Sequence, residues 1–416
     1  MRVLWLASLS ILFTGACSGG GDDDATEEGD DDDDDDTGDD DDDTGDDDDD
    51  DDDDDTGDDD DDDDDTGDDD DDDDDTTIEL PPVPLLADGD ASAVEIVDVA
   101  TVKDGLSMPS DIAFHPKQDT AWITNRDDDS MVVLKDAGTD EQTSDYYWSA
   151  NGSNHFLAKP AALAFGESGD FATIHEEDEL TQGIGGTPVD FMGPTLWTGA
   201  QFQFDGGHSS HLDMLHNSPN GVGIAWVEGN AYYVFDGWND SITFYDFHED
   251  HDLGGSDHSD GEILRCVEGE VSYVEGVGSH LVYDDDNKML YIADTGNNRI
   301  AVLDTTSGTL GGVLSPNYDG LGPGKFNYID DAELTTLIDG ADHGLELPSG
   351  LEIHDDIIYV GDNATSMIHA FTLDGHYITG LDLGLDAGAL QGFAIFDDAI
   401  WFTNEKDHTV SVIRAN

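Results

Sequence analysis

The sequence predicts an all-β fold, a six-bladed β-propeller that is closed by an N-terminal strand. One pattern recurs six times: a short apolar strand, an aromatic-rich strand that ends in Asp or Asn, a polar turn and a third apolar strand. No long helical period interrupts the copies, and repeated short strands separated by turns are typical of a radial β array. The sixth copy ends after three strands, whereas residues 93–102 form a spare strand ahead of the first copy. That strand can complete the sixth blade and remove its exposed edge.

Each copy opens with a first strand, and these strands set the order of the blades. The segment 290–300, Leu-Tyr-Ile-Ala-Asp-Thr-Gly-Asn-Asn-Arg-Ile, resembles the NHL repeat. The resemblance covers about 93–416 and implies a six-bladed propeller, which we bound at 90–416. The predicted first strands are 109–114, 160–165, 219–224, 279–283, 348–353 and 391–396.

The charge of the chain excludes whole classes of partner. The 416 residues include 103 Asp and Glu against 12 Lys and Arg, which gives a formal net charge of −91. Residues 18–77 hold 43 of the acidic residues and no Lys or Arg, yet the remainder is still strongly acidic. Because phosphate contacts need clustered Lys and Arg, we exclude nucleic acid and an anionic membrane surface as partners. The negative charge remains compatible with binding of cations or cationic partners, and with a role in solubility.

The N-terminus predicts an export signal. A basic start precedes an apolar run at 3–13, which is too short to span a bilayer but fits the core of a signal peptide. The following Thr-Gly-Ala-Cys at 14–17 resembles the bacterial lipoprotein box. The resemblance implies that 1–16 is a signal peptide, that Cys17 carries lipid, and that the protein sits at the outer membrane or cell surface. The alternative is an ordinary secretory leader followed by a free Cys17.

Residues 17–80 predict a disordered acidic linker. Asp runs alternate with Thr-Gly pairs, and almost no apolar residue is present to offset the entropy of ordering. Mutual repulsion of like charges extends such a chain, so we expect a spacer between the lipid anchor and the propeller. Diffuse, low-affinity Ca²⁺ binding by the carboxylates is the alternative.

Histidines precede several first strands, and this position predicts a metal site. In a propeller the first strands line the central channel, and the loops before them open on one face, the mouth. Neutral imidazoles are preferred ligands of Zn²⁺, and three convergent ones leave a coordination position open. The alternative is that these histidines hydrogen-bond the backbone. The predicted mouth ligands are His155, His211, His216, His280 and His343, with His208 nearby.

Turns between second and third strands open on the same face and carry scarce cations. Arg126 and Arg299 follow the second strands of blades one and four. Each can pair with surrounding carboxylates, or can bind an anionic ligand through two parallel hydrogen bonds.

A second candidate metal cluster follows the third strand of blade three. Residues 248–261 combine three histidines and several Asp with a Gly-Gly bend, and we expect this loop on the opposite, bottom face. The density of nitrogen and oxygen ligands fits a divalent metal, Zn²⁺ or Ca²⁺, although the spacing is not that of an EF-hand. A solvated acidic loop is the alternative. The candidate ligands are His248, His251, Asp257, His258 and Asp260.

A distant resemblance adds an enzymatic expectation. Asn-His-Phe at 154–156 ahead of Pro160, together with His280 at a blade start and Arg126 after the first blade's second strand, resembles the propeller of peptidylglycine α-amidating lyase. The resemblance implies zinc at His155 and His280, with Arg126 near the substrate as a catalytic residue. The start of blade six departs from that pattern because it reads Gln-Gly-Phe where the third zinc His is expected.

These observations favour an exported, lipid-anchored binding or scaffold module with a divalent-metal site at the channel mouth. Its partners are expected to be the membrane, through Cys17, and a protein, glycan or small molecule at the propeller face. Two alternatives remain: a zinc-dependent lyase or hydrolase, and a purely structural surface-display protein. Whether the chain is an enzyme is left open.

Overall fold

The computed structural model describes residues 80–148, 154–178, 190–201 and 211–415. The predicted signal peptide, Cys17, nearly all of the acidic linker and His208 lie outside these residues. Within them, no helix is both long enough and apolar enough to cross a membrane.

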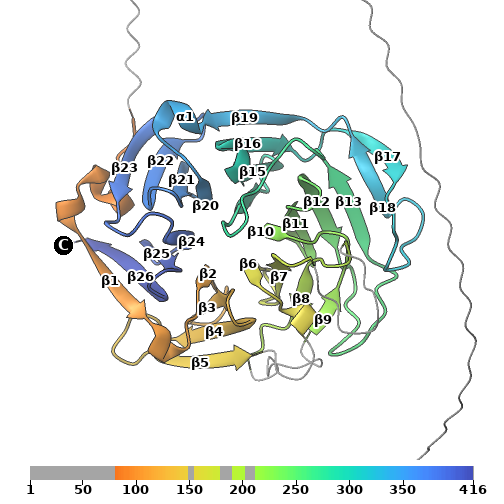
Figure 1. The fold of residues 1–416 in the computed structure, drawn as a ribbon, viewed down its shortest axis with the longest axis horizontal. Coiled ribbons are helices and arrows are strands. Elements are labelled where there is room, and N and C mark those ends of the chain that lie inside the picture. Colours follow the sequence, from red (N-terminus) through yellow and green to blue (C-terminus); the bar gives the residue numbers. More distant parts are fainter. Residues whose placement is uncertain (1–79, 149–153, 179–189, 202–210, 416) are drawn as a thin grey trace, which may run out of the picture. The chain divides into compact units, whose positions relative to one another are not determined.

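Six sheets surround a central axis, and each sheet is one blade, as Figure 1 shows. The predicted six-bladed propeller is therefore confirmed. Blades one and two have four strands each: β2 (Pro109–Phe114), β3 (Thr120–Asn125), β4 (Ser130–Lys135) and β5 (Thr143–Trp148), then β6 (Pro160–Phe165), β7 (Phe171–His175), β8 (Thr195–Trp197) and β9 (His211–Met214).

The other four blades follow in chain order around the ring (Figure 1). Blade three contains β10 (Gly221–Glu228), β11 (Ala231–Asp236), β12 (Ser241–Asp246) and β13 (Glu262–Cys266). Blade four contains β14 (Leu281–Asp284), β15 (Met289–Asp294), β16 (Arg299–Asp304) and β19 (Leu334–Asp339). Blade five contains β20 (Pro348–His354), β21 (Ile357–Asp362), β22 (Met367–Thr372) and β23 (Tyr377–Asp382). Blade six contains β24 (Leu390–Phe396), β25 (Ala399–Asn404) and β26 (Thr409–Ala415).

The N-terminal strand closes the ring. Strand β1 (Val94–Ala100) pairs antiparallel with β26, from Val94 opposite Ala415 to Ala100 opposite Val410. It supplies the outer strand that the sixth copy lacks, which confirms the predicted closure. An open ring would leave the edge of β26 unpaired and available to another chain.

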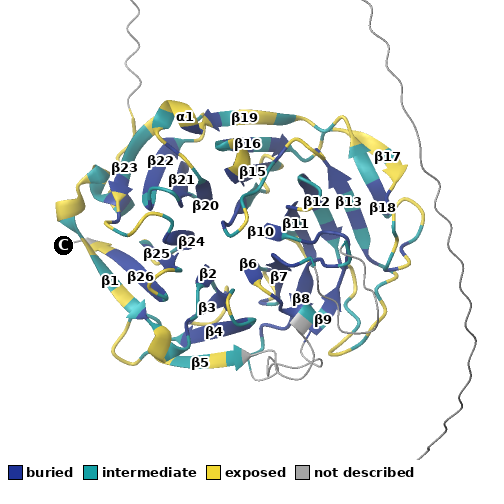
Figure 2. Cartoon of the chain, viewed as in Figure 1, coloured by how far each residue is buried: buried dark blue, intermediate teal, exposed yellow. Residues whose placement is uncertain are grey.

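The core lies between the blades. Middle strands are covered on both faces by neighbouring blades, so they are buried at nearly every position rather than at alternate ones. Strand β3, Thr-Ala-Trp-Ile-Thr-Asn, is buried at every position. Between blades three and four, Val222 and Phe235 pack in one cluster with Leu281 and Ile292. Figure 2 shows that burial follows the inner and middle strands, while the outer strand β17 is largely exposed.

The segment 308–347 extends the sheet of blade three and completes that of blade four. Strands β17 (Thr309–Val313) and β18 (Phe326–Asp330) continue the sheet of blade three, and β18 pairs in parallel with β13. Strand β19 becomes the outer strand of blade four. The segment forms sheet because it has strands of its own that pair with unfilled edges.

Backbone hydrogen bonds join the loops that open on the mouth face. In blade one the Arg126 amide donates to the Met108 carbonyl oxygen over 3.1 Å, and in blade six the Glu405 amide donates to that of Ala389 over 3.0 Å. In both blades the turn after the second strand therefore lies beside the residue that precedes the first strand. This arrangement brings side chains from several blades to one mouth.

Candidate functional site

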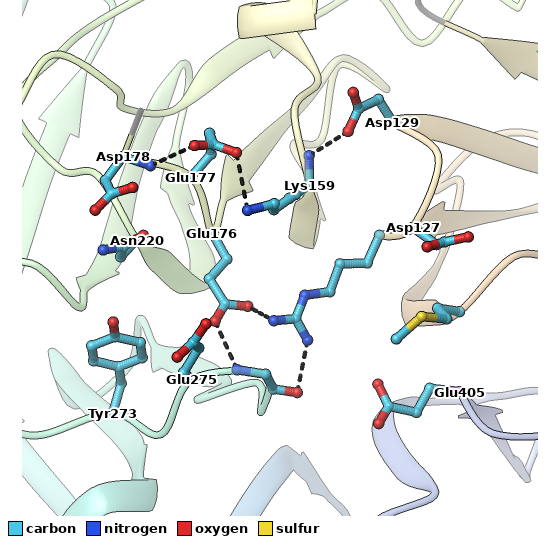
Figure 3. Close-up of a pocket in the computed structure, with 13 residues that line it drawn as sticks. Asp127, Asp129, Lys159, Glu176, Glu177, Asp178, Asn220, Tyr273, Glu275 and Glu405 are labelled. Carbon is cyan, nitrogen blue, oxygen red and sulfur yellow. Dashed lines mark hydrogen bonds and ion pairs between the residues drawn. The ribbon is translucent and has the colours of Figure 1, made fainter. Parts of the chain in front are cut away.

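The channel mouth is an acidic cavity of about 780 Å³, shown in Figure 3. Its walls come from the loops of five blades, all except blade five. Seven carboxyl groups face two cations, Arg126 and Lys159, so the mouth carries an excess of negative charge. The carboxyl groups belong to Asp127, Asp129, Glu176, Glu177, Asp178, Glu275 and Glu405.

Arg126 binds parts of three blades together. Its Nη1 donates to the Gly276 carbonyl oxygen over 2.7 Å, and its Nη2 pairs with Glu176 Oε2. Glu176 Oε1 in turn accepts the Gly276 amide over 2.7 Å (Figure 3). Burial raises the pKa of the Glu176 carboxyl, and the charge of Arg126 opposes this rise. Both terminal nitrogens of Arg126 are thus bound by the protein itself.

Lys159 is the more exposed cation of the mouth. Its Nζ lies 3.1 Å from Glu177 Oε2, and 52% of its side chain is accessible. Its amide donates to Asp129 Oδ1 over 2.9 Å (Figure 3). Each mouth cation therefore has a carboxylate partner, and the remaining carboxylates favour a ligand that presents positive charge.

A candidate metal group lies away from the mouth, where the loop after β12 runs along β9. The ligand atoms of Asp213, His251 and His258 all lie within 4.8 Å of one another. Two backbone hydrogen bonds hold the loop against the strand, His251 N to Leu212 O at 3.2 Å and Gly254 N to His211 O at 3.1 Å. The loop covers the outer edge of blade two and brings its histidines to the Asp213 carboxylate.

The geometry of His251 points to a cation. Its Nδ1 lies 2.7 Å from the Asp252 carbonyl oxygen, which can only accept, so Nδ1 carries the proton. In the neutral ring its Nε2 is then an acceptor; this atom is buried, has no hydrogen-bond partner among the described residues, and lies 4.0 Å from Asp213 Oδ1. Asp213 Oδ1 already accepts from the Met214 amide and from His258. His251 Nε2 is therefore the unsatisfied atom, and a positive ion between it and Asp213 Oδ1 would bind both.

Burial and charge set the protonation of the other two ligands. Burial raises the pKa of Asp213, while the hydrogen bond from His258 lowers it. Burial lowers the pKa of His258, but Asp213, at 2.7 Å from its Nδ1, and the more distant Asp319 and Asp257 outweigh burial and raise it. A metal ion would displace the proton shared between His258 and Asp213, since metal ligands must be deprotonated.

Two more histidines surround this group. The ring of His211 lies 5.1 Å from that of His251, and the ring of His216 lies 5.9 Å from that of His258. His216 Nδ1 pairs with Asp319, whose Oδ2 also accepts the His216 amide over 3.1 Å. Residues from the two predicted clusters therefore meet at the outer edge of blade two, the rim of the propeller.

Three of the histidines predicted at the mouth do not line the mouth cavity. His211 lies on the outer strand β9, and His216 follows it. His343 ends α1 (Gly340–His343) and packs against Phe371 and Tyr377 of blade five's outer half. The loops before blades three and five are long, so a histidine that precedes a first strand in the sequence can lie far from the mouth. His211 and His216 lie at the outer edge of blade two, and His343 lies on the outside of blade five.

His155 and His280 occupy separate environments. His155 lies in η4 (Asn154–Phe156), with its ring 3.8 Å from that of Phe156. His280 lies at the central channel with Nδ1 3.6 Å from Asp111 Oδ1. Neither belongs to a three-ligand metal group in the part of the chain that the structure describes.

The rest of the loop cluster has local partners. His248 lies 3.0 Å from Asp246, Asp257 accepts the Ser259 amide, and Asp260 accepts the Glu249 amide. None of the three joins the described metal group. Asp213 was not predicted from the sequence, although it follows His211 by two residues in the same strand. That spacing was the available signal.

Comparisons with known proteins bear on the fold. No protein-family model matches the chain, and no curated protein does. A protein of unknown function from Bacteroides thetaiotaomicron is 12% identical with a TM-score of 0.52, over 78% of this chain and 76% of that chain. An auxiliary nutrient binding protein from Bacteroides ovatus is 13% identical, with a TM-score of 0.47 over 78% and 77%. Virginiamycin B lyase from Staphylococcus aureus is 12% identical, with a TM-score of 0.45 over 78% and 100%. The first likeness supports the propeller fold and nothing beyond the fold.

Proposed function

We propose that the chain is an exported, lipid-anchored binding module whose propeller holds one divalent transition metal at Asp213, His251 and His258. In this proposal Cys17 carries the anchor, and the acidic linker 17–80 separates the anchor from the propeller. The ligand, a protein, glycan or small molecule, binds at the propeller face. The opposed acceptors His251 Nε2 and Asp213 Oδ1 are the observation that carries the metal site.

The donor set favours zinc or a similar metal over calcium. Two imidazoles and one carboxylate are ligands of Zn²⁺ and other first-row metals, whereas Ca²⁺ takes oxygen ligands. The hydrogen bond from His251 Nδ1 to a backbone carbonyl is the kind of outer contact that orients a metal-binding imidazole. Three protein ligands leave one coordination position for water or a ligand group.

The metal would fasten the loop to the propeller. Asp213 belongs to β9, while His251 and His258 belong to the loop after β12. One ion bound to all three joins segments that are far apart in the sequence, and its binding energy then stabilises the fold. The side chain of His258 is 19% exposed, so a ligand can approach the ion from that side.

Metal content tests this proposal. Full-length protein is stripped with EDTA, reconstituted with zinc, desalted, and measured by elemental mass spectrometry. We expect about one zinc per wild-type chain, its loss in His251→Ala and His258→Ala, and its retention in His376→Ala, whose side chain is 48% exposed. Because 43 acidic residues in 18–77 also attract cations, the difference between variants is decisive. Equal zinc in all four proteins, or none in any, contradicts the site.

The anchor has a separate test. Fractionation of expressing cells should place the wild-type chain with membranes, and Cys17→Ser should release it, since the thiol is the lipidation point. A membrane-bound Cys17→Ser variant, or a soluble wild type, argues against lipidation.

A zinc-dependent lyase or hydrolase is the second candidate, and the open coordination position favours it. The zinc-loaded protein would be incubated with a peptidyl-α-hydroxyglycine. Cleavage that is lost in His251→Ala supports this candidate with the metal at the rim. Cleavage lost instead in His155→Ala and His280→Ala supports the amidating-lyase resemblance, and no cleavage removes both. A purely structural display protein predicts that every one of these variants behaves like wild type.

A further inference from the structure

A second cavity lies at the far end of the central channel. Its volume is about 450 Å³, and it shares no lining residue with the mouth cavity. The first strands of all six blades, β2, β6, β10, β14, β20 and β24, form its wall. Cavities of about 300–1,000 Å³ are the usual size for small organic ligands.

Six aromatic side chains form part of the wall of this cavity, among a larger number of aliphatic ones. Phe114 and Phe396 stack with ring centroids 4.0 Å apart, and Phe165, Trp226 and Tyr283 line the same space. The indole N–H of Trp226 donates to a backbone carbonyl over 3.0 Å, so it is already satisfied. Aromatic faces attract cations, and more strongly where water is excluded.

Two carboxyl groups face this aromatic space. Asp111 is held rigidly, because its two oxygens accept the amides of Ile112 at 2.8 Å and Leu163 at 2.9 Å. The side chain of Glu352 makes no hydrogen bond or ion pair with any described residue. No Lys or Arg is among the described residues that line the cavity. Unlike Glu176 and Glu177 at the mouth, these two carboxyl groups therefore have no Lys or Arg partner.

A buried histidine completes the polar part of the wall. The side chain of His280 is 10% exposed, and its Nδ1 faces Asp111 Oδ1 at 3.6 Å. A proton on Nδ1 is favoured by that carboxylate, which leaves the lone pair on Nε2. His280 Nε2 is buried and has no hydrogen-bond partner among the described residues. It is an acceptor without a donor.

The same groups are poorly suited to a metal ion. Asp111, His280 and Glu352 do not form a group of mutually close ligand atoms, unlike the three residues at the rim. Burial raises the pKa of Glu352 to about 8, and repulsion from Asp111 adds to the rise. Such a carboxyl group gains from a partner that brings both positive charge and N–H donors.

We infer that this cavity binds a small organic cation, a primary amine with an aromatic or apolar body. The ammonium group has N–H donors for Glu352, Asp111 and His280 Nε2, and the body of the ligand packs against the aromatic wall. This site is separate from the proposed metal centre and does not depend on it.

Isothermal titration calorimetry on the full-length protein tests the inference. Benzylamine is the probe, and benzyl alcohol, which has the same ring without the charge, is its matched control. We expect one benzylamine to bind saturably per propeller. Benzyl alcohol should bind with an affinity at least about 10-fold lower than that of benzylamine. Two variants locate the site: Glu352→Gln in the far cavity and Glu405→Gln in the mouth, each checked by thermal unfolding.

We expect Glu352→Gln to weaken benzylamine binding by about 10-fold or more and Glu405→Gln to leave it unchanged. The acidic residues of 18–77 attract any cation equally in both variants, so they do not affect this comparison. EDTA treatment should also leave amine binding unchanged, which separates this site from the metal centre. Equal affinity for benzylamine and benzyl alcohol in wild type, or a loss confined to Glu405→Gln, overturns the inference even if Glu352→Gln fails to fold.

Discussion

The two ends of the central channel hold their charges in different ways. At the mouth each cation already has a carboxylate partner, Arg126 with Glu176 and Lys159 with Glu177. At the far end Asp111 and Glu352 face aromatic rings, and no described Lys or Arg lines the space. At the mouth Arg126 and Glu176 therefore join neighbouring blades, whereas the two carboxyl groups at the far end have no Lys or Arg partner.

The difference follows from the elements that supply each wall. Mouth residues come from turns and loops, where polar side chains are common and can reach a neighbouring blade. Far-end residues come from first strands, whose side chains must also pack against the adjacent blades. A charged residue on such a strand has few polar neighbours, and burial raises the pKa of both Asp111 and Glu352.

Removing the contacts of Arg126 with Glu176 and Gly276 should have the largest effect on stability. Arg126→Ala leaves Glu176 buried without its cation, since the Glu176 side chain is only 5% exposed. We expect the free energy of unfolding to fall by about 3 kcal/mol, measured by urea denaturation.

A second substitution separates this cost from lost packing. In the double variant Arg126→Ala with Glu176→Gln, no buried charge is left unpaired, so part of the stability should return. Arg414→Ala, which loses only one exposed hydrogen bond to the Gly138 carbonyl, is the control. If Arg126→Ala and Arg414→Ala are equally stable, the contacts of Arg126 do not join the blades.

The unpaired carboxyl group of Glu352 should make stability depend on pH in the opposite sense to a salt-bridged acid. Its pKa is raised from 4.5 to about 8 in the folded protein. Between these values the folded state holds a proton that the unfolded state has lost, so stability falls as pH rises, by at most about 1.4 kcal/mol per pH unit. Below pH 4.5 and above pH 8 this contribution no longer changes.

Glu352→Gln should remove that slope. The free energy of unfolding of this variant and of wild type would be measured by urea denaturation from pH 5 to 9. The difference, variant minus wild type, should increase steadily up to about pH 8. Glu333→Gln, a change at an exposed glutamate outside the channel, should follow wild type throughout. Parallel curves for all three proteins would mean that Glu352 ionises normally and that the far end is as well solvated as the mouth.

The sequence predicted the inner strands, which line the central channel, better than the outer parts of the blades. All six predicted first strands begin within two residues of the observed ones, as at Pro109 and Pro348, and the closing strand β1 lies where it was expected. These elements are local repeats with a strong alternating or apolar pattern. Strands β17 and β18 were not predicted, because their place in blade three depends on which sheet edge is left unfilled.

The candidate metal group shows why site prediction was only partial. His251 and His258 were found from ligand density within one loop, but Asp213 was missed and His211 was assigned to the mouth. The contact between β9 and the loop after β12 joins residues about 45 positions apart, such as Asp213 and His258, and no local pattern encodes it. Glu352 was missed for a similar reason: only the closed ring brings it near Asp111.

Substitution of Lys159 should cause the smallest loss of stability, and it tests whether burial of the cation determines the strength of the ion pairs at the mouth. Its pair with Glu177 resembles that of Arg126 in chemistry, yet about half of the Lys159 side chain is in solvent. Water and salt screen an exposed pair, so Lys159→Met should cost only about 0.5 kcal/mol of unfolding free energy. That loss should shrink in 0.5 M NaCl, whereas the loss in Arg126→Ala should persist. A loss as large as that of Arg126→Ala would mean that Glu177 depends on Lys159 as Glu176 depends on Arg126, and that burial of the cation does not decide how much each ion pair of the mouth contributes to stability.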